Sequence, residues 1–348
     1  MTAAQDGPEI LFERRGGLGI VTLNRPRALN ALTHAMCVAM NAQLASWQDD
    51  PAVKTVAIRG AGERAFCAGG DIRALYESGR AGTSYAMDFW RDEYRLNARI
   101  KHYPKPYVAL LHGIVMGGGV GVSVHGSQRV ADTSTVFAMP ETGIGFLPDI
   151  GGSYFLPRLP GETGMYLALS GARLKAPDMA YVGVATHCAA MADWETLIAR
   201  LAAGQHPDTA LADLASRPDP PPLAEHRAAI DRAFSRPSAE AILAALGTEA
   251  GAWGQSIATI LQTKSPTSLK ITFRQLREGS SLDMDHCLRM EYRMVHRILA
   301  GHDFYEGVRA TIIDKDGAPR WEPASLAHVS EADVNAYFAP LGEKELTF

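Results

Sequence analysis

Hydrophobic residues change their spacing several times in the first 140 positions, which predicts an alternation of strands and helices. Residues 10–14 and 18–23 have the pattern of two strands in a hairpin. Behind Thr33, a predicted N-cap, apolar residues recur at helical spacing as far as Trp47. The same criteria predict strands at 53–59, 106–111, 128–131 and 136–138, and helices after Asp71, at 84–100 and at 120–124. This order favours a layered α/β core.

The second half of the chain has a different pattern, in which helices predominate from about Gly161. Four prolines within residues 218–222 interrupt it and indicate an exposed connection. A length of 348 residues suits two domains, or one large domain with an appendage. We predict a core with the active site at 1–205, a proline-rich connection at 206–238 and a helical C-terminal region at 239–348.

Glycine is the one residue type whose distribution is unusual. The chain has 33 glycines, where average usage predicts about 24. Thirteen of them lie between Gly113 and Gly171. This segment has no collagen period and is too apolar for a linker. It predicts packed structure in which the backbone turns tightly or comes close to another group.

Charge and cysteine usage exclude several classes of protein. The net charge of −4 argues against nucleic acid or an anionic membrane as a partner. No apolar run reaches the length of a membrane span, and the N-terminal residues lack the basic and apolar regions of a leader sequence. The four cysteines are far apart and form no paired metal-binding motif. We therefore expect a cytoplasmic protein with reduced thiols and no metal site.

Common catalytic motifs are also missing from the sequence. The glycines after residue 116 do not have the spacing of a dinucleotide-binding GxGxxG, and there is no Walker loop. No GxSxG surrounds a serine, which argues against a serine α/β-hydrolase. No HExxH motif is present for a catalytic zinc.

Two turns rich in glycine, Ala65–Asp71 and His112–Gly119, each follow an apolar strand and precede a predicted helix. Helix N-termini present N–H groups that suit an anionic oxygen. Two such turns directed at one point would form an oxyanion hole. Close packing of a helix against a strand explains the same glycines equally well, so the spacing leaves both interpretations open.

Two carboxylates follow these turns. Glu141 and Asp149 lie eight residues apart, each behind a proline, in an apolar and glycine-rich segment. Carboxylates in such surroundings lose solvation and can act as bases near neutral pH. Each of them alone could instead cap a turn or a helix. Their occurrence together, directly after the glycine turns, favours a functional site.

At this point the sequence resembles the crotonase (enoyl-CoA hydratase/isomerase) superfamily over nearly its whole length. The turns of the superfamily are present as FCAGGDIR and KPYVALLHGIVMGGGVGVSVHG. Two further segments are more specific, FAMPETGIGFLPDIGGSYFLPRL and FYEGVRATIIDKDGAPRWEP. They resemble the branch whose members hydrolyse 3-hydroxyisobutyryl-CoA in valine catabolism.

The resemblance implies an α/β fold with a crotonase-type ββα spiral core and a helical C-terminal region, and a homo-oligomer, either a trimer or a dimer. It implies that the backbone N–H groups of Ala68 and Gly118 form the oxyanion hole. Glu141 and Asp149 match the acidic active-site pair of the family. The expected partner is an acyl-CoA substrate, and no cofactor is expected because CoA is part of that substrate.

Three further positions take a role from the resemblance alone. Glu93 matches a residue that contacts the acyl part of the substrate, although its pattern is that of a solvated helix carboxylate. Gly70 and Asp71, in the first glycine turn, are also expected to bind substrate.

One departure from the family pattern bears on the reaction. Enoyl-CoA hydratases carry a second catalytic glutamate where this chain has Gly121, and typically glycine where it has Asp149. Hydration of a double bond needs both glutamates, so the resemblance implies thioester hydrolysis instead. The expected base or nucleophile is Glu141, while Asp149 and Glu93 would hold the 3-hydroxyl group.

Several alternatives stay open at the level of the sequence. A carboxylate can activate water, or it can attack the carbonyl and form an anhydride that water opens. The protein could also be a hydratase or isomerase of the same family, or an acyl-CoA-binding protein without catalytic activity.

Overall fold

The computed structural model describes residues 7–249 and 251–348. The chain forms two compact units, each assembled from separate segments. The first unit contains the residues up to Gly70 together with Arg95–Phe137 and Leu174–Pro220. The second unit contains the remaining segments, Asp71–Tyr94, Ala138–Arg173 and Pro221–Phe348.

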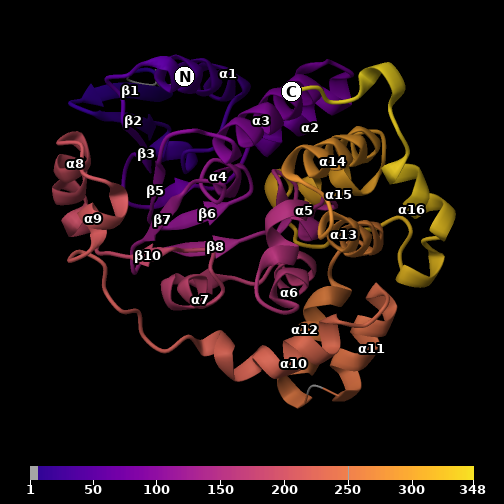
Figure 1. Ribbon diagram of the computed structural model, residues 1–348. Coiled ribbons are helices and arrows are strands. Elements are labelled where there is room, and N and C mark those ends of the chain that lie inside the picture. The colour runs from indigo at the N-terminus through magenta and orange to yellow at the C-terminus, as the bar shows by residue number, and fades with distance from the viewer. Residues whose placement is uncertain (1–6, 250) are drawn as a thin grey trace. The chain divides into compact units, whose positions relative to one another are not determined.

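A six-stranded sheet forms the centre of the first unit, in the order β1-β2-β3-β5-β7-β10 (Figure 1). Its strands are β1 (Ile10–Arg15), β2 (Leu18–Leu23), β3 (Thr55–Gly60), β5 (Tyr107–Leu111), β7 (Gln128–Ala131) and β10 (His187–Cys188). Only β1 runs antiparallel to its neighbour, as predicted for a hairpin. The other pairs are parallel. Parallel neighbours require crossover segments, which here contain helices such as α1 (His34–Asp49) and α3 (Tyr85–Lys101), whereas the C-terminal helices follow the last strand.

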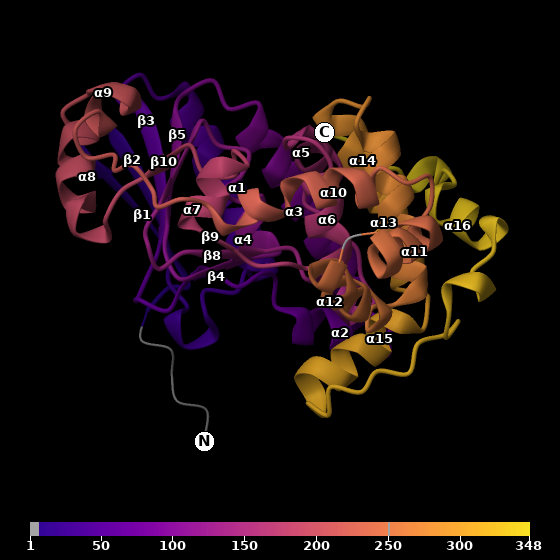
Figure 2. The same ribbon diagram turned by 90° about the horizontal axis from the view of Figure 1, so that it is seen from below.

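Helices cover this sheet through apolar side chains. Helix α1 (His34–Asp49) begins behind Thr33, whose hydroxyl accepts the N–H of Met36 at 3.3 Å, so the predicted N-cap is confirmed. Helices α8 (Trp194–Ala202) and α9 (Pro207–Leu211) bury their apolar residues on β2, β3, β5 and β7. Figures 1 and 2 both show these two helices beside the sheet.

A second, four-stranded sheet carries the two glycine turns. Its order is β4-β6-β8-β9, with the bounds β4 (Ala65–Cys67), β6 (Ile114–Met116), β8 (Val136–Ala138) and β9 (Leu174–Lys175). Strands β4 and β6 run parallel, so their carboxyl ends, from which both turns leave, lie at one edge of the sheet. The predicted helix at 120–124 begins earlier and is shorter, as α4 (Gly118–Gly121).

The second unit is almost entirely helical (Figure 2). It contains α2 (Ile72–Ala81), the first part of α3 (Tyr85–Lys101), α5 (Gly152–Phe155) and α6 (Thr163–Ser170). Its C-terminal helices are α10 (Arg227–Phe234), α11 (Ala239–Glu249), α12 (Gly251–Gln262), α13 (Pro266–Gly279), α14 (Met284–Ile298), α15 (Asp303–Val308) and α16 (Glu331–Phe338). The short helix α7 (Ala176–Tyr181) belongs to the first unit.

The compact units do not follow the predicted order of parts along the chain. The segments 71–94 and 138–173 come from the predicted core but belong to the unit of the C-terminal helices. Their aromatic side chains explain this, because Trp90 stacks on Phe146 with ring centroids 5.5 Å apart and both rings contact Phe304 of α15. The last change of unit along the chain lies between Pro220 and Pro221.

Asn30 ties together the loops at the base of the first glycine turn. It is fully buried, and its backbone φ of +56° lies in the left-handed region. Its side-chain amide donates to the carbonyls of Ala61 at 2.9 Å and Ala65 at 2.8 Å, and its side-chain oxygen accepts the N–H of Arg25 at 2.9 Å. Three backbone groups therefore depend on one side chain.

We expect Asn30→Ala to lower the free energy of unfolding by about 3 kcal/mol, because buried polar groups lose their partners. Denaturation in urea measures this change. Asn24→Ala is the control, since the Asn24 amide makes its hydrogen bond at the surface. Its expected effect is below about 1 kcal/mol. Equal losses in the two variants would contradict the role given to Asn30.

Candidate active site

Among the described residues of the second unit, four carboxyl groups belong to side chains with exposed fractions of 6% or less. Glu93 projects from α3, Glu141 begins the 3-10 helix η2 (Glu141–Ile144), Asp149 precedes α5, and Glu291 lies on α14. Their exposed fractions are 2%, 6%, 5% and 0%. The structure thus brings Glu93, Glu141 and Asp149 into one unit and adds a fourth group that the sequence analysis did not identify.

Burial and mutual repulsion raise the pKa values of these groups. Loss of solvation is the largest cause for each of them. The pKa of Asp149 is raised to about 7 and that of Glu291 to about 8. The charge of Asp149 also raises the pKa of Glu93 and Glu141, both of which lie well above the usual range. Carboxyl groups with such values can exchange protons near neutral pH.

The carboxyl groups differ in what their oxygen atoms contact. Glu93 Oε1 and Glu141 Oε2 are buried and have no hydrogen-bond partner within the described part of the chain. Asp149 Oδ2, by contrast, accepts the hydroxyl of Tyr94 at 2.7 Å, a bond that lowers the pKa of Asp149 against the effect of burial. The site therefore holds two uncommitted carboxyl oxygens and one carboxylate that is fixed in place.

Tyr94 and Glu291 are the functional candidates that the sequence analysis missed. Tyr94 is fully buried and directly follows Glu93, but a tyrosine in a helix is usually a core residue. Glu291 was detectable in principle, because it is a charged residue among the apolar positions of α14, such as Leu288 and Val295. The hydrogen-bond partners of both side chains include residues of the segment 149–153, which is distant from each of them in the sequence.

The two glycine turns pack against each other within the first unit. A Cβ atom at Gly119 would lie 2.3 Å from the carbonyl oxygen of Cys67, so no side chain fits between them. A Cβ at Gly69 would lie 3.9 Å from the nitrogen of Gly118. Gly118 begins α4, where the helix itself supplies no acceptor for its N–H. The close approach of the two turns agrees with the geometry that an oxyanion hole needs.

Of the three site residues predicted in the first turn, Ala68 and Asp71 have structural partners. The N–H of Ala68 donates to the carbonyl of Leu29 at 3.0 Å, so the predicted oxyanion donor is already engaged inside the protein. Asp71 caps α2, with its carboxylate accepting the N–H of Ala74 at 3.4 Å. Among the described residues, the N–H of Gly70 has no such acceptor.

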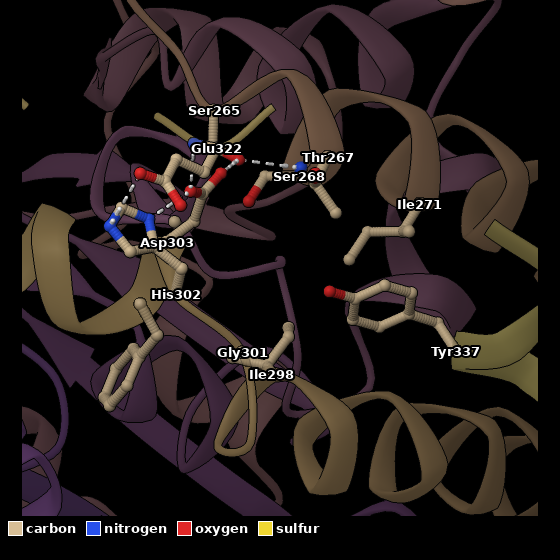
Figure 3. A pocket seen from close by; sticks show the side chains of 12 residues that line it. Ser265, Thr267, Ser268, Ile271, Ile298, Gly301, His302, Asp303, Glu322 and Tyr337 are labelled. Atoms are coloured by element: carbon tan, nitrogen blue, oxygen red, sulfur yellow. Dashed lines mark hydrogen bonds and ion pairs between the residues drawn. The ribbon is translucent and has the colours of Figure 1, made fainter. Parts of the chain in front are cut away.

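A small cavity lies elsewhere in the second unit, at the beginnings of α13 and α15 (Figure 3). Its volume is about 30 Å³, enough for one water molecule. Asp303 on its wall accepts the hydroxyl of Ser265 at 2.6 Å and the N–H of Glu322 at 2.8 Å, and its other neighbour is the ring of His302. Through these bonds, Asp303 at the beginning of α15 connects the beginning of α13 with the segment around Glu322. None of the predicted site residues lines this cavity.

Two kinds of feature are absent from the described residues. They contain no group of three histidine, cysteine or carboxylate side chains arranged to hold a metal ion. None of the helices in that part of the chain combines the length and the apolar character that crossing a bilayer demands.

Comparison with known proteins identifies the family. The profile of the enoyl-CoA hydratase/isomerase family matches residues 18–338. The mitochondrial 3-hydroxyisobutyryl-CoA hydrolase of Danio rerio is 49% identical, over 99% of this chain and 93% of that protein. The human protein of the same name is 45% identical, over 98% of this chain and 91% of that protein.

Two solved structures have the same fold along the whole chain. One is titled a carnitinyl-CoA dehydratase from Mycobacterium thermoresistibile, with a TM-score of 0.94 and 44% identity over 98% of this chain and 99% of that one. The other is titled an enoyl-CoA hydratase from Rhodobacter sphaeroides, with a TM-score of 0.90 and 40% identity over 98% and 100%. The predicted α/β crotonase fold with a helical C-terminal region is confirmed.

The predicted cytoplasmic location is wrong by this comparison, because the relatives at 45–49% identity are named mitochondrial. Widely spaced cysteines indicate only a reducing environment and do not discriminate between compartments that share it. The predicted resemblance, in contrast, is confirmed over the full length. The chain belongs to the enoyl-CoA hydratase/isomerase family, the crotonase superfamily.

Proposed function

We propose that the protein hydrolyses 3-hydroxyisobutyryl-CoA to 3-hydroxyisobutyrate and CoA. The observation that carries this proposal is the buried set of carboxyl groups in the second unit, in which Asp149 accompanies Glu141. Full-length relatives at 45–49% identity that bear the name of this hydrolase support the same reaction. An acyl-CoA thioester is therefore the substrate class.

Glu141 is the proposed base or nucleophile. Its Oε2 atom has no partner among the described residues, and its raised pKa suits a group that accepts a proton near neutral pH. As a base it removes a proton from water, whose oxygen bonds to the thioester carbon. The carbon–sulfur bond then breaks, and the proton passes to the sulfur of CoA. Direct attack by the carboxylate, followed by hydrolysis of the anhydride, gives the same products.

The other two carboxyl groups suit the 3-hydroxyl of the substrate. Asp149 accepts the hydroxyl of Tyr94 through Oδ2 and is also hydrogen-bonded by its own backbone N–H. A carboxylate has about four acceptor positions, so it can accept a substrate hydroxyl in addition. Glu93 has an uncommitted Oε1. A hydroxyl group can donate one hydrogen bond and accept another, so it can bridge an ionised and a protonated carboxyl group. This pairing would distinguish hydroxyacyl thioesters from plain acyl thioesters.

For the oxyanion hole we propose the N–H groups of Gly118 and Gly70. Gly70 replaces Ala68 in this assignment, because the Ala68 N–H already donates to Leu29. The substrate carbonyl oxygen becomes negative as the tetrahedral intermediate forms, and two fixed donors stabilise that charge. Each such donor typically contributes about 10²- to 10³-fold to the rate.

Hydration is the second candidate reaction, since the two similar solved structures are titled a dehydratase and a hydratase. Gly121 argues against it, because it provides no carboxylate where the family resemblance implies one in hydratases. Crotonyl-CoA separates the candidates: loss of its enoyl absorbance, with no release of free CoA, would favour hydration. Tight acyl-CoA binding without either product would favour a non-catalytic protein.

Two further expectations belong to this proposal. We propose that the reaction needs no cofactor, because water is the only co-reactant of hydrolysis. Activity after dialysis against EDTA measures this. We also propose a homo-oligomer, a dimer or a trimer, which light scattering of the purified protein distinguishes from a monomer.

We expect Glu141→Gln to lower kcat for 3-hydroxyisobutyryl-CoA by at least about 10²-fold, the usual contribution of a general base. Release of free CoA, detected with a thiol reagent, gives the rate. Glu343→Gln, at an exposed glutamate, is the matched control and should keep full activity. Undiminished CoA release by Glu141→Gln would rule out the proposed role.

We expect Tyr94→Phe to shift the acidic limb of the pH profile of kcat/KM to higher pH. The Tyr94 hydroxyl stabilises ionised Asp149, so its removal raises the pKa of Asp149 further above about 7. Fewer molecules then carry the ionised form at neutral pH, and activity there falls. Tyr305→Phe is the control, because it also removes a tyrosine hydroxyl, one that donates a part-buried hydrogen bond to the carbonyl of Leu299. This variant should leave the pH profile unshifted. An unshifted limb in Tyr94→Phe would contradict the proposal.

A further inference from the structure

The loop that presents Asp149 has an unfavourable backbone conformation. Ile150, directly after it, has a φ of +56°, and Gly151 has a φ of +81°. A β-branched residue is strained in this region because its Cβ approaches the following carbonyl oxygen. Such a conformation persists only where the surroundings impose it. The direction of the Asp149 side chain therefore depends on what holds this turn.

Glu291 holds the turn on its C-terminal side. Its Oε2 accepts the N–H of Gly151 at 2.8 Å, and its Oε1 accepts both the N–H of Ser153 at 2.9 Å and the Ser153 hydroxyl at 2.5 Å. Both carboxylate oxygens are thus used by backbone donors from one segment. Three donors around a single carboxylate fix its position tightly.

Gln275 of α13 holds the turn on its N-terminal side. Its Nε2 donates to the carbonyl of Pro148 at 2.7 Å and lies 3.5 Å from Glu291 Oε1. Asp149 is therefore bracketed by hydrogen bonds to the residues before and after it. Its own side chain is fixed separately by Tyr94.

A structural explanation would be that Glu291 only caps the short helix α5. A serine or asparagine at the cap position would do this locally and without a buried charge. Here the cap comes from a carboxylate 138 residues away in the sequence, with an exposed fraction of 0%. Burying a charge is costly, and the cost rises beside like charges.

The electrostatic surroundings of Glu291 disfavour its ionised form. Burial and the charge of Asp149 raise its pKa, and its hydrogen bonds lower it only in part. The charge of Asp149 acts on Glu291, and Glu291 in turn raises the pKa values of Tyr94 on α3 and Cys287 on its own helix. None of these three groups is a cation. A cap that served stability alone would not need this group.

We propose that Glu291 is a positioning residue, which holds the strained turn at Ile150 and Gly151 and thereby fixes the direction of the Asp149 carboxyl group. The proposal rests on the role in hydrolysis proposed for Asp149. Glu291 does not touch the substrate. It fixes the position of the Asp149 carboxyl group, which is proposed to contact the substrate. Small displacements of such groups lower the reaction rate steeply.

The test variant is Glu291→Gln, which keeps the shape of the side chain. A glutamine has one acceptor oxygen, so its NH₂ group would face one of the two backbone N–H donors and the turn would lose that bond. We expect kcat for 3-hydroxyisobutyryl-CoA to fall by about 10- to 100-fold, while KM changes by less than about threefold. Gln275→Met, which removes the bond to Pro148, should have a smaller effect in the same direction.

A double-mutant cycle with Asp149→Asn separates positioning from general stability. If Glu291 acts through Asp149, Glu291→Gln should reduce the residual kcat of Asp149→Asn by less than about threefold. Asp283→Ala is the matched control, because Asp283 caps the same helix α14 without contacting the turn. It should lower the melting temperature and leave kcat of the folded protein unchanged.

The outcomes separate this proposal from the proposed function. If Asp149→Asn keeps its kcat, the role of Asp149 fails, and the role of Glu291 fails with it. If Asp149→Asn is impaired but Glu291→Gln is as active as Asp283→Ala, only the proposal for Glu291 is overturned. It is also overturned if the effects of Glu291→Gln and Asp149→Asn multiply, because Glu291 then acts independently of Asp149.

Discussion

The cost of burying several carboxyl groups together is the constraint on which the site depends. Glu93, Glu141, Asp149 and Glu291 are each exposed by 6% or less. Apolar surroundings disfavour the ionised form, and the charge of Asp149 raises the pKa of the other three. The four groups cannot all be ionised at neutral pH, so they share protons as a set. This is the property that a base for thioester hydrolysis needs, and it comes at the expense of stability.

In the first unit, close packing of the backbone shapes the two glycine turns. Gly119 packs so closely on the carbonyl of Cys67 that a side chain there would separate the two turns. Gly117 has φ of +48° and ψ of −126°, a combination that residues with a Cβ atom avoid. Glycines later in the same segment also pack against backbone, since a Cβ atom at Gly145 would lie 2.1 Å from the carbonyl oxygen of Asp303 and one at Gly164 would lie 1.8 Å from that of Leu156. Much of the excess of glycine between residues 113 and 171 is thus explained by close backbone packing.

The sequence was most informative where local rules apply. The hairpin at residues 10–23, the N-cap Thr33, the helix after Asp71 and the strands at 128–131 and 136–138 follow from short-range patterns, and the structure confirms them. The compact units were not predictable in this way. Segments 71–94 and 138–173 join the C-terminal helices because of aromatic contacts that no periodicity reveals.

The family and the acyl-CoA substrate class could be determined from the sequence alone, because the residues that carry them reside in contiguous motifs. The same motifs predicted Glu141 and Asp149 as site residues. Only the tertiary structure decided which groups form hydrogen bonds with the residues of the predicted site and with the turns that carry them. It engages the N–H of Ala68 with Leu29, places the Tyr94 hydroxyl on Asp149 and brings Glu291 to the turn behind it. Each of these contacts joins residues that are distant along the chain. Burial and hydrogen bonding, which set a pKa, are properties of the folded protein rather than of any segment.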